Sequence, residues 1–321
     1  MRLSRFRKGG RVMVALAALA AVTALGQEDS GLVAGLKEKL KASEFEFSRA
    51  NSDVPFIPVM QLSATAYGRS EFQRVDGSGD KVEFRNSCVG GYAMVPLHIG
   101  RRDLVVAAPY ASHTRFNFLT DGFADQGVDS LYLPVGGAWQ TDTGRQWGGF
   151  VMPTFNSPLA GDGDWATDFM GGVLGRSFSG DRAVWYYGLI YDYSFGGNFF
   201  YPYLGYSYQF DPHWVFSLIA PWPTLSYAPS DRFFVGAGVT PSGATWTLNQ
   251  SGKGAQAVGS FGGWDLGAYC GWRLTRLLWF GAGIGFSGLR SLQVDESGDT
   301  SFEQKLSREP FVNVSLTARP N

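Results

Sequence analysis

The feature that most constrains the fold is an alternation of apolar with polar or small side chains, sustained over long segments. It is clearest in residues 182–195, 200–210, 264–274 and 278–290, where one face is apolar and rich in aromatics and the other carries Gly, Ser, Tyr and charged residues. Successive side chains of a strand point to opposite faces, so the pattern predicts strands with one apolar surface. Soluble strands usually have about 5–6 residues, whereas membrane-spanning strands need about 9–11. The length of these segments favours strands that cross a bilayer.

The composition agrees with a wall between lipid and water. Charged residues make up 17% of the chain, aromatic residues 15%, and there are 43 glycines. The charged fraction is below the roughly 25% of ordinary globular domains. A formal net charge of −1 argues against a nucleic-acid partner, because phosphate binding needs a basic surface.

The N-terminus has the anatomy of a secretory signal peptide. A basic start is followed by an apolar run over residues 12–25, which ends in the small residues around Gly26. The run is shorter than the roughly 20 residues of a membrane-spanning helix. We therefore predict a signal peptide over residues 1–26 and export of the remaining chain.

Between the signal peptide and the strands, residues 27–58 are predicted to form a periplasmic lead-in. A short amphipathic helix is expected there, with a disordered linker as the alternative. Its apolar positions, spaced four residues apart, are Leu32, Leu36 and Leu40.

The turns predict a simple up-and-down order over residues 59–321. Short turns alternate with longer Gly- and Asp-rich connections, as in barrels that have periplasmic turns and extracellular loops. Residues 214–229 contain Pro221 and Pro223 and are expected to form a short, partly spanning hairpin. The predicted fold class is all-β, a transmembrane antiparallel up-and-down β-barrel of 12–14 strands, with 14 favoured when the short hairpin is included.

Ionisable residues on faces predicted to line the lumen are the best candidate functional residues, because charge in a membrane protein is costly unless it meets water or a partner. They suggest either a mixed-charge constriction that filters solutes or a network of inward ion pairs that holds the barrel. These candidates are Glu83, Arg85, His113, Arg115, Asp168, Arg176, Asp192, Asp265 and Arg273.

No cofactor, metal site or enzymatic activity is predicted. The three histidines, His98, His113 and His213, have no metal-ligand spacing. Cys88 and Cys270 lack a CxxC partner and are expected to be unpaired thiols that face lipid. An outer-membrane hydrolase would need His113 or His98 beside a Ser or Asp, and no Gly-x-Ser-x-Gly motif accompanies them.

Several aromatic segments carry a resemblance to known barrels. They are 201–208 (YPYLGYSY), 214–221 (WVFSLIAP) and 225–229 (LSYAP). The chain resembles outer-membrane β-barrel families of unknown function and, more distantly, transporter-type barrels. The resemblance implies the outer membrane of a Gram-negative bacterium, with the lipid bilayer and the outer-membrane assembly machinery as partners. It assigns no ligand-binding residue.

The sequence therefore predicts a porin-like channel for small solutes that has no enzymatic activity. One alternative is a plugged or structural barrel whose extracellular loops bind a partner. An outer-membrane hydrolase is a further alternative, and a soluble secreted β-sandwich is disfavoured by the strand length.

Overall fold

The computed structural model describes residues 42–46, 52–55, 58–73, 80–141, 144–159, 165–194, 197–219, 222–249, 256–296 and 299–319. The predicted signal peptide and the predicted helix of the lead-in lie outside these residues, so both remain predictions. Among the described residues, no helix is long and apolar enough to cross a membrane.

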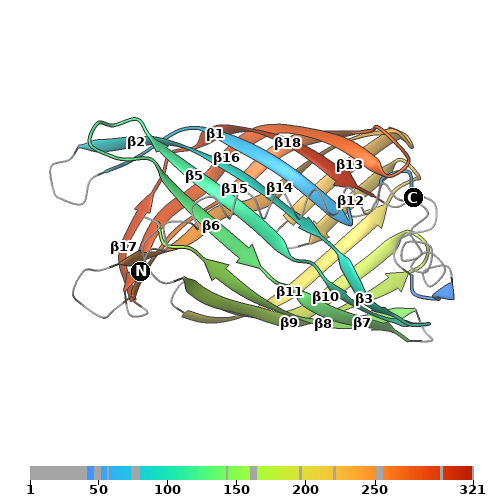
Figure 1. Cartoon of the computed structure of the whole chain (residues 1–321). Helices are drawn as coiled ribbons and strands as arrows, with labels where there is room; N and C mark the ends of the chain where they lie inside the picture. The colour runs from blue at the N-terminus through green and yellow to red at the C-terminus, as the bar shows by residue number, and fades with distance from the viewer. Residues whose placement is uncertain are drawn as a thin grey trace.

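The chain forms one antiparallel sheet that closes on itself as a barrel (Figure 1). Closure occurs at β1, which pairs with β2 on one side and with β18 on the other. The ring passes through 14 strands, because β2 and β3, β4 and β5, β6 and β7, and β17 and β18 each continue one strand. The prediction of an up-and-down barrel with 14 strands is confirmed.

The first nine strand segments are β1 (Met60–Gln73), β2 (Lys81–Ala93), β3 (Val95–Ile99), β4 (Asp103–Ala107), β5 (Tyr110–Phe118), β6 (Gln126–Tyr132), β7 (Val135–Gln140), β8 (Arg145–Asn156) and β9 (Ala166–Ser179). The others are β10 (Ala183–Ser194), β11 (Gly197–Gln209), β12 (Trp214–Ile219), β13 (Trp222–Ser230), β14 (Phe233–Asn249), β15 (Gln256–Arg273), β16 (Leu278–Glu296), β17 (Asp299–Lys305) and β18 (Glu309–Ala318). The predicted short hairpin is β12–β13, and β14, β15 and β16 are the longest strands.

Prolines bend one side of the barrel wall. Pro109 separates β4 from β5 and Pro134 separates β6 from β7, because proline has no backbone N–H for the ladder. The wall stays continuous across the bend, since the Ala93, Ala108 and Leu133 amides donate to the carbonyls of the prolines on the neighbouring strands, at 3.4, 2.9 and 3.0 Å. The prolines explain why two strands of the ring each appear as two segments, β4 with β5 and β6 with β7.

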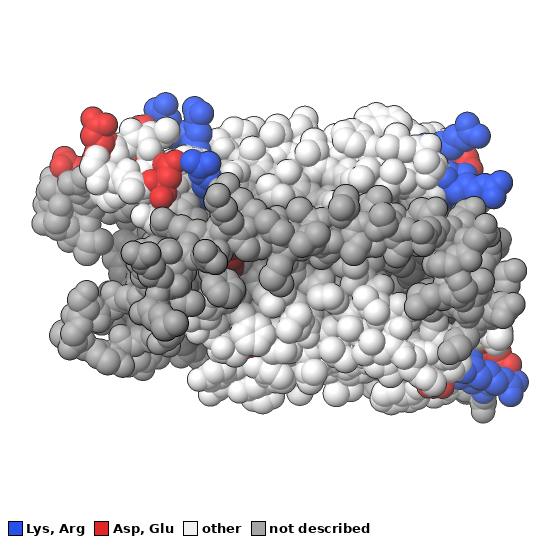
Figure 2. Space-filling model, viewed as in Figure 1, with Lys and Arg blue, Asp and Glu red and all other residues white. Residues whose placement is uncertain are grey.

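The outer surface of the barrel carries an apolar band. Large side chains such as Leu189, Leu204 and Ile284 are 52, 60 and 65% exposed on strands whose neighbouring residues point inward. On the face shown in Figure 2, the described charged side chains that protrude from the surface gather at the two ends. Soluble monomers rarely expose a continuous apolar surface of this extent, whereas lipid-facing barrels require one.

Two apolar clusters lie inside the barrel rather than on its outside. The larger contains Phe84, Phe116, Trp246 and Phe261, and the smaller contains Phe234 and Trp279. The larger cluster brings together rings from β2, β5, β14 and β15, which belong to opposite walls. The lumen is therefore partly filled by its own side chains.

Candidate functional site: a lumen closed at two levels

The aromatic cluster crosses the lumen toward the end that carries the β1–β2 and β5–β6 loops. The Phe84 and Phe261 ring centroids are 6.3 Å apart in an edge-to-face arrangement, and those of Phe116 and Trp246 are 5.5 Å apart. Such tilted and edge-to-face pairs are the favoured geometry of buried aromatic rings. They occupy the space that an open diffusion pore would leave to water.

A backbone contact between non-adjacent strands closes the same end further. Thr247 of β14 forms a bridge with Pro158, which follows β8. The Leu159 amide donates to the Thr247 carbonyl at 3.2 Å, and the Thr247 amide donates to the Ser157 carbonyl at 3.4 Å. The end of β14 thus lies against the opposite wall, at the level of the aromatic cluster.

A fully buried ion pair lies beside this cluster. Arg290 of β16 pairs with Glu309 of β18, and neither side chain is exposed to solvent. Ser70 donates to Glu309 at 2.6 Å, and Arg290 donates to Asn86 at 3.2 Å. The Arg290 guanidinium also lies 4.3 Å from the Phe261 ring centroid, a cation–π distance. The network ties β1, β2, β16 and β18 together from the inside.

A cavity of about 490 Å³ remains on the other side of this network. β1 and β18 line it with a ladder of uncharged hydrogen-bonding side chains, and β15 and β16 contribute glycines. The register places the ladder residues opposite one another in the pairs Gln61–Thr317, Ser63–Ser315 and Thr65–Asn313.

Asp265 lies in the wall of this cavity and is 7% exposed. Its carboxylate accepts hydrogen bonds from the Tyr67 hydroxyl at 2.8 Å and from the Ser242 hydroxyl at 2.9 Å. Both donors are neutral, so the carboxylate has hydrogen-bonding partners but no direct cation at these contacts.

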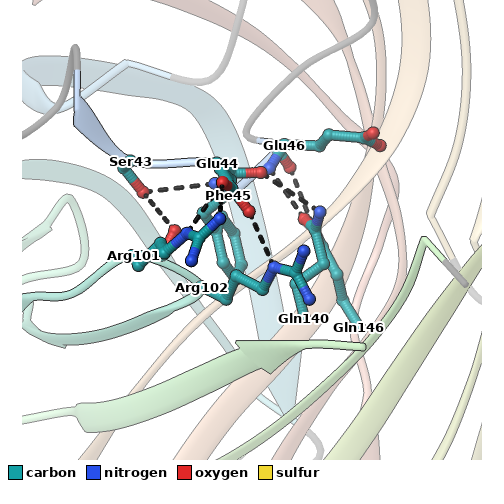
Figure 3. Close-up of polar contacts among 8 residues, drawn as sticks. All are labelled: Ser43, Glu44, Phe45, Glu46, Arg101, Arg102, Gln140 and Gln146. Carbon is teal, nitrogen blue, oxygen red and sulfur yellow. Dashed lines mark hydrogen bonds and ion pairs between the residues drawn. The ribbon is translucent and has the colours of Figure 1, made fainter. Parts of the chain in front are cut away.

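The opposite mouth of the barrel holds part of the segment that precedes β1. We call residues 42–46 and 52–55 the N-terminal strap; its first part is drawn in blue at the right of Figure 1. Glu44 binds Arg101 at 2.6 Å and Arg102 at 2.8 Å, both in the turn between β3 and β4 (Figure 3). These two arginines hold the pKa of Glu44 below its ordinary value, because they favour the ionised carboxylate.

The backbone of the strap is also held by glutamine side chains from β7 and β8. The Glu46 amide donates to Gln140 Oε1 at 2.8 Å, and Gln146 Nε2 donates to the Glu46 carbonyl at 3.0 Å (Figure 3). Arg176 of β9 donates to the same carbonyl and to Gln146. Phe45 is buried among these contacts at 8% exposure. Three neighbouring strands therefore bind one short stretch of the strap.

The second part of the strap contacts the turn between β11 and β12. Asp53 Oδ2 lies 3.0 Å from His213 Nδ1, and the Asp53 amide donates to the Pro212 carbonyl at 2.8 Å. Val54 packs against the inner cluster that contains Phe234 and Trp279. The two described parts of the strap thus contact the mouth at separate places, the β3–β4 turn and the β11–β12 turn.

Five of the predicted candidate residues lie on the inner face, but they do not converge on one constriction. Arg176 holds the strap, and Asp265 lines the cavity. Asp168 accepts from Asn156 at 3.3 Å, Asp192 lies on the neighbouring β10, and Arg273 pairs with Asp231 at 3.1 Å near a turn. Asp168 and Asp192 lie close enough to interact electrostatically, but the structure does not bring all five together into a single charged filter.

The other four, Glu83, Arg85, His113 and Arg115, lie on the outer face, contrary to the prediction. Their neighbours in the chain, such as Phe84 and Phe116, point into the aromatic cluster. Near the end that carries the β1–β2 and β5–β6 loops, the lumen is apolar and the outside is charged. The apolar face of β2 and β5 therefore points inward there, the reverse of the middle of the barrel. Cys88, predicted to face lipid, also lines the cavity instead.

Both histidines considered for a hydrolase site lie beside an aspartate. His113 Nδ1 contacts Asp129 Oδ1 at 2.8 Å, and His98 contacts Asp103 at 2.9 Å. Among the described residues, neither histidine has a serine partner. The described part of the chain also contains no group of three or more His, Cys, Asp or Glu residues placed to hold a metal ion.

Sequence reasoning missed Arg290, Glu309 and the strap contacts. Extending the alternation of residues 278–286 along β16 places Arg290 on the outer face, but the register shifts between Gly262 and Trp264 on the paired β15. Leu289, next to Arg290, has a φ of 50° and is 85% exposed. This irregularity is a β-bulge, which reverses the inside–outside alternation beyond it. An isolated Arg in a segment otherwise free of charge was the available signal.

Comparison with solved structures shows outer-membrane barrels of similar architecture. An outer-membrane channel from Pseudomonas putida F1 is 10% identical, with 84% of this chain and 100% of that chain covered and a TM-score of 0.41. The toluene transporter TodX of P. putida is 11% identical, with 82% and 90% covered and a TM-score of 0.37. The translocator domain of the autotransporter NalP from Neisseria meningitidis is 14% identical, with 94% and 97% covered and a TM-score of 0.32.

No protein-family model and no curated protein sequence matches the chain. The solved structures include channels, a transporter and a translocator, and their similarity to this chain is low. They resemble it in barrel architecture alone, and nothing about the substrate or mechanism of this chain is taken from them.

Proposed function

We propose that the chain is a bacterial outer-membrane β-barrel that passes small solutes through a gated route, with the N-terminal strap as its periplasmic gate. The proposal rests chiefly on the seating of the strap at the mouth that carries the short turns. Glu44 and Asp53 anchor it to separate turns of that mouth through Arg101, Arg102 and His213.

The membrane location is supported by the outer surface. The apolar band includes side chains more than half exposed, and the described charged side chains that protrude from the visible face gather at the ends. Burying such a band in lipid removes it from water, which is favourable by a free energy of roughly 25 cal/mol per Å² of apolar surface. In an outer membrane the short turns face the periplasm, so the strap lies on that side.

Gating, rather than free diffusion, is supported by the two levels of closure. The aromatic cluster meets across one end of the lumen and the strap is bound at the other. The strap is attached by a few hydrogen bonds and by exposed ion pairs, which water screens. Contacts of this kind can be broken and re-formed, unlike the ladder of the barrel wall.

The proposed gate is tested by single-channel recording in planar bilayers. Residues 27–321 are refolded with the native sequence or with Arg101→Gln and Arg102→Gln together, which removes both partners of Glu44. We expect the variant to open several times more often than the native chain at neutral pH, with the same conductance when open.

A matched control is Arg276→Gln, since Arg276 is exposed in the turn between β15 and β16 and lies apart from the strap contacts. It should leave the opening frequency unchanged. Equal opening by all three proteins would show that the strap does not gate the barrel. A chain that never conducts, in any of these forms, would favour the alternative of a plugged barrel.

A further inference from the structure

The cavity between β1, β14–β16 and β18 is lined on β15 and β16 by glycines. Gly267, Gly271, Gly281 and Gly283 line it where larger side chains would project inward. A Cβ added at Gly283 would lie 3.4 Å from the Ala268 carbonyl oxygen and 3.8 Å from Asn313 Cβ, which are ordinary contacts. The cavity is large enough for one small organic molecule, since small-ligand sites span about 300–1,000 Å³.

The lining of this cavity favours an uncharged occupant. The ladder on β1 and β18 consists of neutral hydroxyl and amide groups. Asp265 and Arg319 are the charged residues among the described lining residues. The Arg319 guanidinium lies 5.3 Å from the Phe234 ring centroid, at the other end of the cavity from Asp265. The lining between these two ends is neutral, so an ionised solute held there would lack a counter-ion.

Aromatic rings lie at both ends of the cavity. The Tyr67 and Phe311 ring centroids are 6.0 Å apart beside Asp265, and those of Phe234 and Trp279 are 5.6 Å apart at the other end. Ring faces and edges at these positions can pack against the ring of a bound molecule in the tilted geometries that aromatic pairs prefer. Aromatic solutes therefore fit the apolar part of the lining.

Asp265 supplies a directional hydrogen-bond acceptor at one aromatic end. A carboxylate has about four lone-pair positions, and the Tyr67 and Ser242 hydroxyls use two of them. A ligand hydroxyl can donate to a remaining position, whereas a ligand carboxylate would be repelled by the like charge. The acceptor thus distinguishes hydroxylated solutes from acidic ones.

From these features we propose that this cavity binds one small, uncharged aromatic molecule that carries a hydroxyl group, which donates to Asp265. The inference deepens the proposed function, because it names the class of solute that the gated barrel passes. Phenol is the simplest member of the class, and toluene is its counterpart of nearly equal shape without the hydroxyl.

Isothermal titration calorimetry on refolded residues 27–321 in one detergent tests the site. We expect saturable binding of phenol, at least tenfold weaker binding of toluene, and no binding of benzoate or glucose. In Asp265→Asn the preference for phenol over toluene should fall several-fold, because a hydrogen bond to a neutral amide is weaker than one to a carboxylate.

Two further variants separate the cavity from other sources of signal. Gly283→Leu places a side chain in the cavity and should abolish phenol binding to the protein. The partitioning of phenol into the detergent is the same for the variant and the native chain, so it cannot account for the difference. Asp168→Asn removes a different inward carboxylate and should leave both affinities unchanged. Heat-modifiable gel migration shows whether each variant is folded as a barrel.

Phenol binding that persists in folded Gly283→Leu, or that is equalled by toluene or benzoate, would overturn the proposal. So would an absence of saturable phenol binding to the native chain. These outcomes are independent of the gate, because binding is measured without transport. If phenol binds but the strap variant opens no more often than the native chain, the site stands and the proposed gate fails.

Discussion

The Arg290–Glu309 pair is the most consequential contact at the scale of single residues. Both side chains are fully buried, and the surrounding contacts come from Ser70, Asn86 and the Phe261 ring. Removal of one partner leaves the other charge buried without compensation, which typically costs about 3–5 kcal/mol. The pair is therefore expected to matter more for stability than any exposed ion pair of the barrel.

We expect Glu309→Gln to lower the free energy of unfolding by several kcal/mol, as measured by guanidinium unfolding of the barrel in lipid vesicles. Replacing both partners with methionine should be less damaging than Glu309→Gln alone, since no uncompensated charge remains. The control is Arg69→Met, which breaks an exposed pair with Glu83 at 3.1 Å and should cost less than about 1 kcal/mol. An equal loss for Glu309→Gln and Arg69→Met would contradict this account.

Alternation predicts whether a side chain points inward or outward only where the apolar face lies on the outside of the barrel along the whole strand. On β10 the apolar face lies on the outside, and Asp192 lies on the inner face as predicted. On β2 and β5 the same rule placed Arg85 and His113 inward, although the apolar face fills the lumen there. Alternation reports that two faces differ, but it does not report which face is the inside.

At the scale of elements, the strap is a segment whose attachment depends on pH. The pKa of Glu44 is lowered by Arg101 and Arg102 when the strap is seated, so ionised Glu44 stabilises the seated strap. This stabilisation is fully present above the ordinary pKa of a glutamate and is lost as the pH falls through the lowered pKa.

We therefore expect the strap to stay seated at neutral pH and to be released as the pH falls below the ordinary pKa of a glutamate. A fluorescent probe attached through Ser43→Cys, with Cys88 and Cys270 replaced by serine, reports release as a fall in anisotropy. In Glu44→Gln the anisotropy should already be low at neutral pH and change little on acidification. An acid transition that persists unchanged in Glu44→Gln would assign the release to another group.

Prolines made one short hairpin predictable from the sequence, but at two other places they interrupt strands that are continuous in the sheet. Pro221 and Pro223 indicated the short hairpin that the structure shows as β12–β13. Pro109 and Pro134 interrupt strands that the hydrogen bonds carry across the bend. The strap, in contrast, has no sequence signal, because its contacts join residues far apart in the chain, such as Glu44 and Arg101.

At the scale of the whole molecule, the barrel class and its 14 strands follow from strand length, alternation and turn spacing. The closure of the lumen does not follow from them. It depends on which rings meet across the barrel and on the bridge between Pro158 and Thr247, and both need the three-dimensional register. A sequence of this kind therefore predicts the strands of the barrel wall better than it predicts which side chains fill the lumen.

Whether the barrel spans lipid and has a filled lumen is tested most directly by nitroxide accessibility at adjacent positions of β10. Leu189 is 52% exposed on the outer band and Ile190 is 6% exposed on the inner face. Each is changed to cysteine in a chain whose Cys88 and Cys270 are replaced by serine, then spin-labelled and reconstituted in vesicles. We expect the label at position 189 to collide readily with oxygen and hardly with a water-soluble nickel chelate. The label at position 190 should be protected from oxygen dissolved in the bilayer. Equal access of the nickel chelate to both labels would contradict this account, because the outer face would then lie in water.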